Sequence, residues 1–197
     1  MHRGTALLTA FRKDYQLRDF AQVLIQREWS LFASAGTKKF LDTAGIPSTD
    51  IGDLVGPPIL GHRVVTLDRK IYAAILARRD NADDIRELKR IGVDPIDLVY
   101  VDLYPLAEEL KNPNRTVESV IEKTDIGGPT LLRAAAKGGR YVLSHSNQFQ
   151  QVLHFFDHRH ESPKHFLAGL AAHAEEVVSE YATLSARFHQ SVALGTF

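Results

Sequence analysis

The amino-acid sequence predicts an α/β fold, with a doubly wound, mostly parallel sheet and a helical C-terminal region. Apolar runs of strand length, such as residues 6–11, alternate with segments whose apolar side chains recur at helical spacing, such as residues 17–29. Residues 95–103 form a nearly continuous β-branched and apolar run, which is typical of a strand buried on both faces of a parallel sheet. Turns that contain glycine follow such runs, at the sheet edge where these folds bind ligands.

Each expected element follows from its local pattern. Strands are expected at residues 6–11, 30–33, 95–103 and 141–144, where the runs are short, apolar and bounded by turn residues. Helices are expected at residues 17–29, 37–45, 83–90, 116–123, after the Gly127-Gly128 pair, and at 165–188, the last either continuous or interrupted near Gly169. Residues 71–79 fit a helix or an extended segment, residues 62–67 fit a short strand or an extended segment, and residues 50–61, rich in Gly and Pro, are expected to form a loop.

Length and composition limit the class of protein. The chain has 197 residues, which fits one domain over residues 1–197, with residues 145–197 mainly helical. Its formal net charge is zero, so we expect neither a nucleic-acid nor a membrane partner. The absence of cysteine excludes disulfides, thiolate metal ligands and a cysteine nucleophile. No run approaches the ~18 apolar residues of a membrane span, and no signal peptide is recognisable at the start, so we expect a cytoplasmic protein.

The segment 124–137 (TDIGGPTLLRAAAK) carries the strongest functional signal. Gly127 and Gly128 let the backbone turn, and the Pro-Thr pair that follows suits the first turn of a helix. The free N–H groups of such a helix start hold an anion or a polarised oxygen. Asp125 and Lys137 form a carboxylate and ammonium pair if both reach one pocket. The alternative is an ordinary surface helix that Asp125 caps, with Lys137 in solvent.

A second turn of this kind follows the strand expected at residues 30–33. Ser34 and Thr37 supply hydroxyl groups, and Gly36 lies between them at the start of the next helix. Backbone N–H groups and hydroxyls at a helix start bind phosphate, so these residues are candidates for a phosphate site. The alternative is that the two hydroxyls only cap the helix.

Four stretches that carry these motifs follow one another in a recognisable order. They are residues 33–39 (ASAGTKK), 63–67 (RVVTL) with 75–80 (ILARRD), 97–99 (DLV) with 103–105 (LYP), and 125–137 (DIGGPTLLRAAAK). Together they resemble the IMP cyclohydrolase domain of the bifunctional purine-biosynthesis enzymes that also carry an AICAR transformylase. The resemblance extends from about Ala6 to about Lys137 and fades beyond Arg140.

The resemblance implies a methylglyoxal-synthase-like fold without the transformylase domain, a homodimer, and a purine ribonucleotide substrate. The implied reaction is the ring closure of FAICAR to IMP with loss of water, which needs no cofactor. The implied catalytic residues are Asp125, which would polarise or deprotonate the amide, Lys137, which would stabilise oxyanion charge, and Tyr104, which would position the formyl group or its water. The implied substrate- and phosphate-binding residues are Lys13, on a poorer match, Ser34, Gly36, Thr37, Arg63, Thr66, Gly127 and Gly128.

Some positions depart from the family pattern. Where the family reads Arg-Val-Lys-Thr-Leu-His-Pro-Lys, this chain has RVVTLDRK at residues 63–70, so Val65 replaces a lysine that contacts the base and Asp68 replaces a histidine. The later His-Gly-Gly reads Tyr-Ala-Ala from Tyr72, and the first loop, residues 9–16, lacks two hydroxyls and a glycine. These changes favour altered substrate handling. They leave open an enzyme that acts on a related purine-precursor or purine-analogue ribonucleotide, and a purine-nucleotide-binding module without catalysis.

Histidines gather in residues 154–165, together with Asp157. His154 and His158 are spaced to face one side of a helix, where they could ligate zinc with His160 or His165. No glutamate follows the first histidine as it does in metalloprotease helices, and histidine-rich polar stretches usually lie in solvent. We therefore expect no metal in this chain.

Overall fold

Five parallel strands form the sheet, which confirms the predicted α/β class. The computed structural model describes residues 4–158 and 162–197. The strands are β1 (Gly4–Ala10), β2 (Trp29–Ala33), β3 (Thr49–Asp50), β4 (Leu98–Asp102) and β5 (Tyr141–Leu143), in the spatial order β3-β2-β1-β4-β5. All four neighbouring pairs are parallel. The order reverses between β1 and β4, which is the place where doubly wound folds bind ligands.

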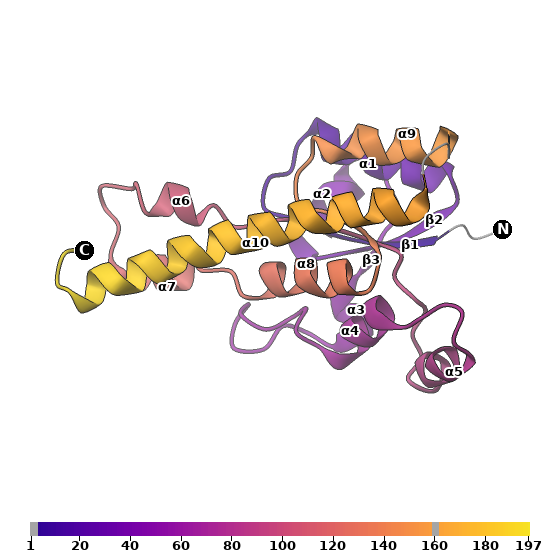
Figure 1. Ribbon diagram of the computed structural model, residues 1–197, viewed down its shortest axis with the longest axis horizontal. Coiled ribbons are helices and arrows are strands. Elements are labelled where there is room, and N and C mark those ends of the chain that lie inside the picture. The colour runs from indigo at the N-terminus through magenta and orange to yellow at the C-terminus, as the bar shows by residue number, and fades with distance from the viewer. Residues whose placement is uncertain (1–3, 159–161) are drawn as a thin grey trace.

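The helices cover both faces of this sheet (Figure 1). They are α1 (Tyr15–Gln26), α2 (Ala35–Thr43), α3 (Ile51–Val55), α4 (Arg69–Leu76), α5 (Ala82–Arg90), α6 (Leu106–Glu109), α7 (Val117–Glu122), α8 (Gly127–Lys137), α9 (Gln148–His158) and α10 (Pro163–Ala193). Helices α1 and α9 lie side by side on one face, where Phe20 and Phe149 stack with ring centroids 4.1 Å apart. Helices α8 and α4 lie on the opposite face.

The central strands explain why the core forms here. Ala6, Leu7 and Leu8 in β1 and Leu98 and Val99 in β4 are fully buried. A strand covered by helices on both faces must be apolar at consecutive positions, which is the pattern that the sequence shows. The core therefore centres on the β1 and β4 pair, and the loops that leave the carboxyl ends of these two strands are held on a rigid base.

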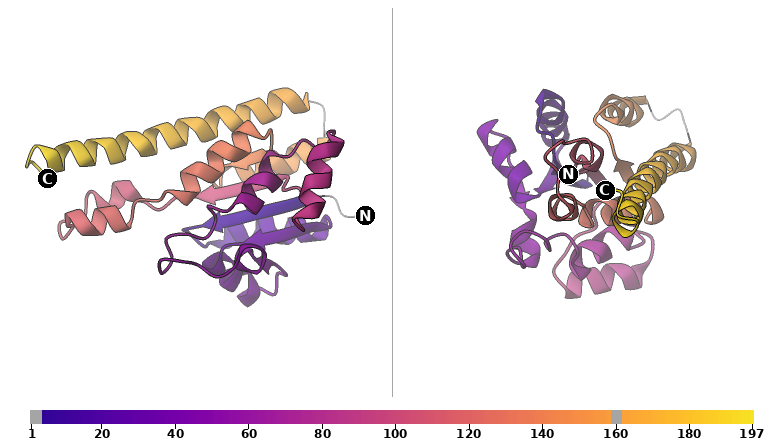
Figure 2. Two further views of the ribbon diagram at one scale, coloured as in Figure 1. Left: turned by 90° about the horizontal axis from the view of Figure 1, so that it is seen from below. Right: turned by 90° about the vertical axis from the view of Figure 1, so that its left-hand side faces the viewer.

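Helix α10 extends well beyond the sheet and carries a small second core. Its 31 residues span about 46 Å at 1.5 Å per residue. Figures 1 and 2 show its C-terminal half running past the strands, with α6 and α7 beside it. Leu106, Val120, Tyr181 and Phe188 form the buried cluster between these three helices. We call this projection, residues 103–125 with 181–197, the arm.

Local capping accounts for several helix starts. Asp14 accepts the Leu17 N–H at the start of α1, and Asn81 accepts two N–H groups at the start of α5. Thr116 and Ser119 form a reciprocal capping box at the start of α7. Side chains of this kind satisfy amides that have no partner inside the helix, which explains why the predicted starts agree within two or three residues.

The structure corrects one expectation, the loop at residues 50–61, and decides between the alternatives for residues 62–67 and for the last helix. Residues 50–61 are not one loop, because Asp50 ends strand β3 and accepts the Gly52 N–H to start the short helix α3. Residues 62–67 are not a strand, and only one isolated antiparallel bridge, Ile59 with Val64, forms there. Helix α10 is not interrupted at Gly169, where a side chain would meet open space, because one glycine weakens a long packed helix by only about 1 kcal/mol.

Arg140 ties the end of α4 to the start of β5. Its buried guanidinium donates to the carbonyl oxygens of Ile75, at 2.6 Å, and of Ala77. These carbonyls lie at the end of α4, where no N–H group of the helix is available to donate to them, so the arginine supplies the missing hydrogen bonds. Its positive charge also interacts favourably with the negative end of the helix dipole.

We predict that Arg140→Met lowers the free energy of unfolding by about 1–3 kcal/mol, since it leaves buried carbonyls without a donor. Arg133→Met on α8 is the control, because Arg133 makes only an exposed ion pair with Glu175 and its loss should change stability by under about 1 kcal/mol. Urea denaturation followed by circular dichroism measures both. Equal losses would contradict the structural role of Arg140.

Candidate functional site

The site is built around the carboxylate of Asp125, which lies under the turn that opens α8. Asp125 Oδ1 accepts the N–H of Gly128 at 2.9 Å, and the nearby amides of Gly127 and Tyr104 also favour the charged carboxylate. The N–H of Asp125 itself donates to the hydroxyl of Tyr181 on α10, at 2.8 Å. The residue is therefore fixed from both sides, by amides that converge on its side chain and by a hydroxyl that receives its backbone N–H.

Two glycines make room for this arrangement. A Cβ atom at Gly128 would collide with Asp125 Oδ2 and would lie 2.6 Å from Leu103 Cδ2. A Cβ atom at Gly127 would lie 2.8 Å from Thr66 Oγ1. Both positions have ordinary negative φ angles, so close approach is the reason for glycine here rather than an unusual backbone conformation.

Burial changes the acidity of Asp125. Burial raises its pKa above the ordinary aspartate value, and hydrogen bonds from the amides of Gly128, Gly127 and Tyr104 offset only part of that rise. The folded protein therefore binds this proton more tightly than the unfolded chain does. The resulting stabilisation is present at low pH and is lost as the pH rises through the raised pKa. A carboxylate with a raised pKa is a better proton acceptor than an exposed one.

The second turn lies at the start of α2 and is tied to the end of β1. Thr37 is fully buried, and its hydroxyl accepts the Ala10 N–H at 3.0 Å and the Ser34 hydroxyl at 3.1 Å. Thr37 thus holds the loop together rather than presenting its hydroxyl to solvent. Lys13 donates to the carbonyls of Ala10 and Phe11, which places its ammonium group close to Gly36. The first amides of α2 and a lysine are therefore adjacent, an arrangement that suits a phosphate.

A line of contacts joins the two turns along the carboxyl edge of the sheet. The N–H of Phe11 donates to the carbonyl of Asp102, and that of Arg12 donates to the Asp102 carboxylate at 2.6 Å. The rings of Phe11 and Tyr104 then pack with centroids 4.9 Å apart. Because the Tyr104 amide lies beside the Asp125 carboxylate, the structure brings the residues of both predicted turns to one rim, with Lys13 at one end and Thr66 at the other.

Lys137 and Arg63 do not join this rim. Lys137 ends α8, about 15 Å from Gly127 along the helix, which is longer than a lysine side chain. Within one chain it therefore does not meet Asp125. The guanidinium of Arg63 is bound to Glu122 at the end of α7, at 2.6 Å. The amide of Gly128 is also engaged, because it donates to the carboxylate of Asp125.

The positions that depart from the family pattern have structural roles here. Val65 packs against the core, and Asp68 caps α4 by accepting the Lys70 N–H at 2.7 Å. The ammonium group of Lys70 donates to the carbonyl of Leu54. The segment that would face a bound base thus offers an aliphatic side chain and an engaged carboxylate rather than a free cation.

Sequence reasoning missed two tyrosines beside Asp125. Tyr181 lies in the C-terminal part of the chain, where the resemblance has faded, and nothing in the local pattern marks it. Tyr72 lies on α4, and its only signal was that it replaces the histidine of the family's His-Gly-Gly.

The histidine segment does not form a metal centre in the described part of the chain. The rings of His154 and His158 stack with centroids 4.1 Å apart, and no group of three or more potential ligands comes together among residues 4–158 and 162–197. His160 lies outside the described residues.

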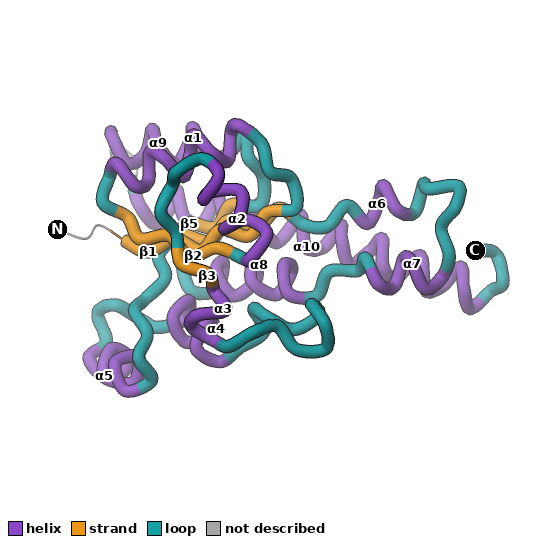
Figure 3. The backbone as a smooth tube through the Cα atoms, turned by 180° about the vertical axis from the view of Figure 1, so that it is seen from behind, coloured by secondary structure: helices purple, strands orange, loops and turns teal. Residues whose placement is uncertain are grey.

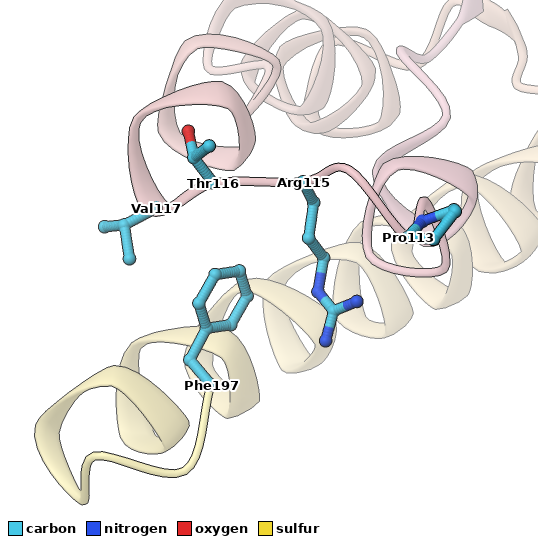
Figure 4. A pocket seen from close by; sticks show the side chains of 5 residues that line it. All are labelled: Pro113, Arg115, Thr116, Val117 and Phe197. Atoms are coloured by element: carbon cyan, nitrogen blue, oxygen red, sulfur yellow. The ribbon is translucent and has the colours of Figure 1, made fainter.

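A hollow on the arm lies apart from the strand ends. Figure 4 shows its lining, in which the Arg115 guanidinium lies 4.9 Å from the centre of the Phe197 ring, beside Pro113, Thr116 and Val117. Figure 3 shows that the C-terminus and the start of α7 are both at the far end of the arm. This hollow holds none of the predicted site residues.

Comparison with known proteins agrees with this geometry. The family described as the MGS-like domain matches residues 16–130, which include both turns and the strands β2, β3 and β4. The chain belongs to the MGS-like domain family. The match ends inside α8, so α9 and α10 lie beyond it.

This MGS-like domain also resembles part of larger proteins. It is 42% identical over 187 residues to the bifunctional purine biosynthesis protein PurH of Thermosynechococcus vestitus, covering 89% of this chain and 36% of that protein. It is 41% identical over 138 residues to PurH of Staphylococcus aureus strain Newman, covering 68% of this chain and 28% of that protein. The chain thus spans about a third of the length of these relatives. It is homologous to a part of PurH.

One solved structure matches along its whole length. The crystal structure of ForH superposes with a TM-score of 0.79 and 30% sequence identity, and the match covers 96% of this chain and 100% of the ForH chain. In the described part of our chain, no helix is both long enough and apolar enough to cross a bilayer.

We predict that Gly128→Ala displaces Asp125, because its Cβ would meet the carboxylate, and that it lowers the free energy of unfolding by about 1–3 kcal/mol. Gly169→Ala in α10 is the matched control, since its Cβ meets nothing and alanine favours a helix by about 1 kcal/mol over glycine. If Asp125 fills the space at Gly128, thermal unfolding should show a lower melting temperature for Gly128→Ala and a higher one for Gly169→Ala. A stabilised Gly128→Ala protein would refute that packing.

Proposed function

We propose that this chain closes the pyrimidine ring of FAICAR to give IMP. The observation that supports it best is the convergence of three backbone amides on the desolvated carboxylate of Asp125, in a homologue of PurH. A buried carboxylate at the strand ends of an MGS-like domain suits the removal of a proton from an amide that is otherwise a poor nucleophile.

The reaction joins two groups of one molecule. The carboxamide nitrogen attacks the formyl carbon and loses one proton as the C–N bond forms. The C–O bond to the former formyl oxygen then breaks, and that oxygen leaves as water with the first proton and with a second proton from the formamide nitrogen, where a C=N bond forms. The protein has to hold these groups together and accept the first proton, and Asp125 is placed for that transfer. Tyr104, half-exposed beside Asp125, is assigned to the formyl group and its departing water. No cofactor enters the proposed reaction.

The phosphate of the nucleotide is assigned to the other end of the rim. The first amides of α2 are directed to the loop in which Lys13 lies, and Gly36 and Ser34 lie at that helix start. This assignment differs from a phosphate at Gly127 and Gly128, because the Gly128 amide donates to the carboxylate of Asp125. The proposed substrate thus lies along the rim, with its phosphate at α2 and its base at α8.

A second candidate is supported by Val65 and Asp68. In the family the position of Val65 holds a lysine that contacts the base, whereas here the side chain packs against the core and Asp68 caps α4. This favours an enzyme of the same reaction class that acts on a different purine-precursor or purine-analogue ribonucleotide. Its phosphate would be held in the same way, because that end of the site does not involve Val65.

Incubation of the purified chain with FAICAR tests the proposal, with IMP followed by absorbance and chromatography. We expect turnover by the wild type, and we expect Asp125→Asn to lower kcat by about 10²–10⁴-fold, because asparagine keeps an acceptor for the Gly128 N–H but takes no proton. The affinity for IMP, measured by calorimetry, should change far less than kcat.

Asp19→Asn is the control, since Asp19 lies on the surface of α1 and pairs only with its neighbour Arg18. It should leave both kcat and IMP affinity unchanged. A wild type that binds IMP but does not turn FAICAR over would replace the first proposal by the second candidate. Failure to bind any of IMP, XMP and AICAR would refute both.

A further inference from the structure

The hydroxyl oxygen of Tyr72 is buried and makes no hydrogen bond with any residue that the structure describes. Buried hydroxyls almost always have a partner, because the loss of hydrogen bonds to water costs free energy. The ring is held by packing, since Tyr72 packs against the hydrophobic core and belongs to α4, which lies against α8. The fold thus maintains an unsatisfied hydroxyl in a fixed position.

The surroundings of this hydroxyl belong to the Asp125 turn. It lies near the hydroxyl of Thr130 on the first turn of α8, which itself donates to the Ile126 carbonyl at 2.6 Å. Burial raises the pKa of Tyr72, the Thr130 hydroxyl offsets part of this rise, and the negative charge of Asp125 adds to it. Tyr72 therefore keeps its proton near neutral pH and is a neutral donor beside a carboxylate.

We propose that the Tyr72 hydroxyl donates a hydrogen bond to the carboxamide oxygen of FAICAR, the atom that becomes the ring carbonyl oxygen of IMP. This assignment rests on the proposed function. As Asp125 takes a proton from the carboxamide nitrogen, the electrons of the broken N–H bond are shared with the carboxamide oxygen, so negative charge grows on that oxygen. A donor fixed at this place is unsatisfied before the reaction and stabilises the charge that forms during it. No proton leaves Tyr72 in this step.

The loop of residues 56–68 contacts the turn that holds Asp125. Protein covers the Tyr72 oxygen, and Thr66 of this loop rests on Gly127. Only one isolated bridge orders the loop internally, and its ion pair with α7, Arg63 with Glu122, is exposed to solvent. Exposed ion pairs contribute little to stability, so this ion pair adds little to the free energy that holds the loop in place.

Tyr72→Phe tests the proposal, because it removes the oxygen and keeps the ring. We expect kcat for FAICAR to fall about 10²-fold with KM within about threefold of the wild type, as for a donor that acts on charge formed in the transition state. The melting temperature of the free protein should stay the same or rise, since the variant removes an unsatisfied buried hydroxyl.

Tyr181→Phe is the matched variant, because its hydroxyl accepts the Asp125 N–H at 2.8 Å. Its melting temperature should fall by about 2–4 °C, as for the loss of one hydrogen bond in a chain of this size. Unchanged kcat in Tyr72→Phe, beside an active wild type, would overturn the role of Tyr72 and leave the proposed function standing. A similar fall in melting temperature for both variants would show that the Tyr72 hydroxyl has a structural partner, which also overturns it. An inactive wild type would overturn both proposals.

Discussion

The carboxylate of Asp125 occupies the space that Gly127 and Gly128 leave at the start of α8, and much of the carboxyl edge of the sheet depends on this contact. It accepts a hydrogen bond from the Gly128 amide at this helix start, and the backbone amide of Tyr104 lies beside the same carboxylate. Thr66 rests on Gly127, so the loop of residues 56–68 is positioned from the same turn. The start of α8 therefore holds an internal anion, the carboxylate of Asp125.

The arm explains how this turn is held from outside the sheet. Tyr181 lies in the small core that α10 forms with α6 and α7, and its hydroxyl receives the Asp125 N–H. Helix α10 also packs along α8 and β5. The longest helix of the chain thus connects the arm to the backbone of the residue that we assign to proton transfer. Packing in a helix that belongs to no recognised motif contributes to the geometry of the site.

The sequence predicted the features that depend on local pattern and failed where distant contacts decide. Continuous apolar runs marked β1 and β4, and the glycine pair marked the start of α8, because periodicity and turn chemistry are local. The two-residue strand β3 carries no periodicity, and its place follows from its pairing with β2. The resemblance put Lys137 beside Asp125, but the length of α8 separates them within one chain. The contact of the Tyr181 hydroxyl could not be predicted, since its partner lies 56 positions earlier in the chain.

The pKa of Asp125 is the most direct test of this account, because it reports whether the carboxylate is desolvated under the turn. The ¹³Cγ chemical shift of Asp125, assigned by comparison with the Asp125→Asn variant, can be followed by NMR as the pH is changed. We predict a midpoint above the ordinary aspartate value of about 3.9, since burial disfavours the charged form more than the three amides favour it. A midpoint at or below that value would contradict the account, because the carboxylate would then be a well-solvated or fully compensated helix cap rather than a base.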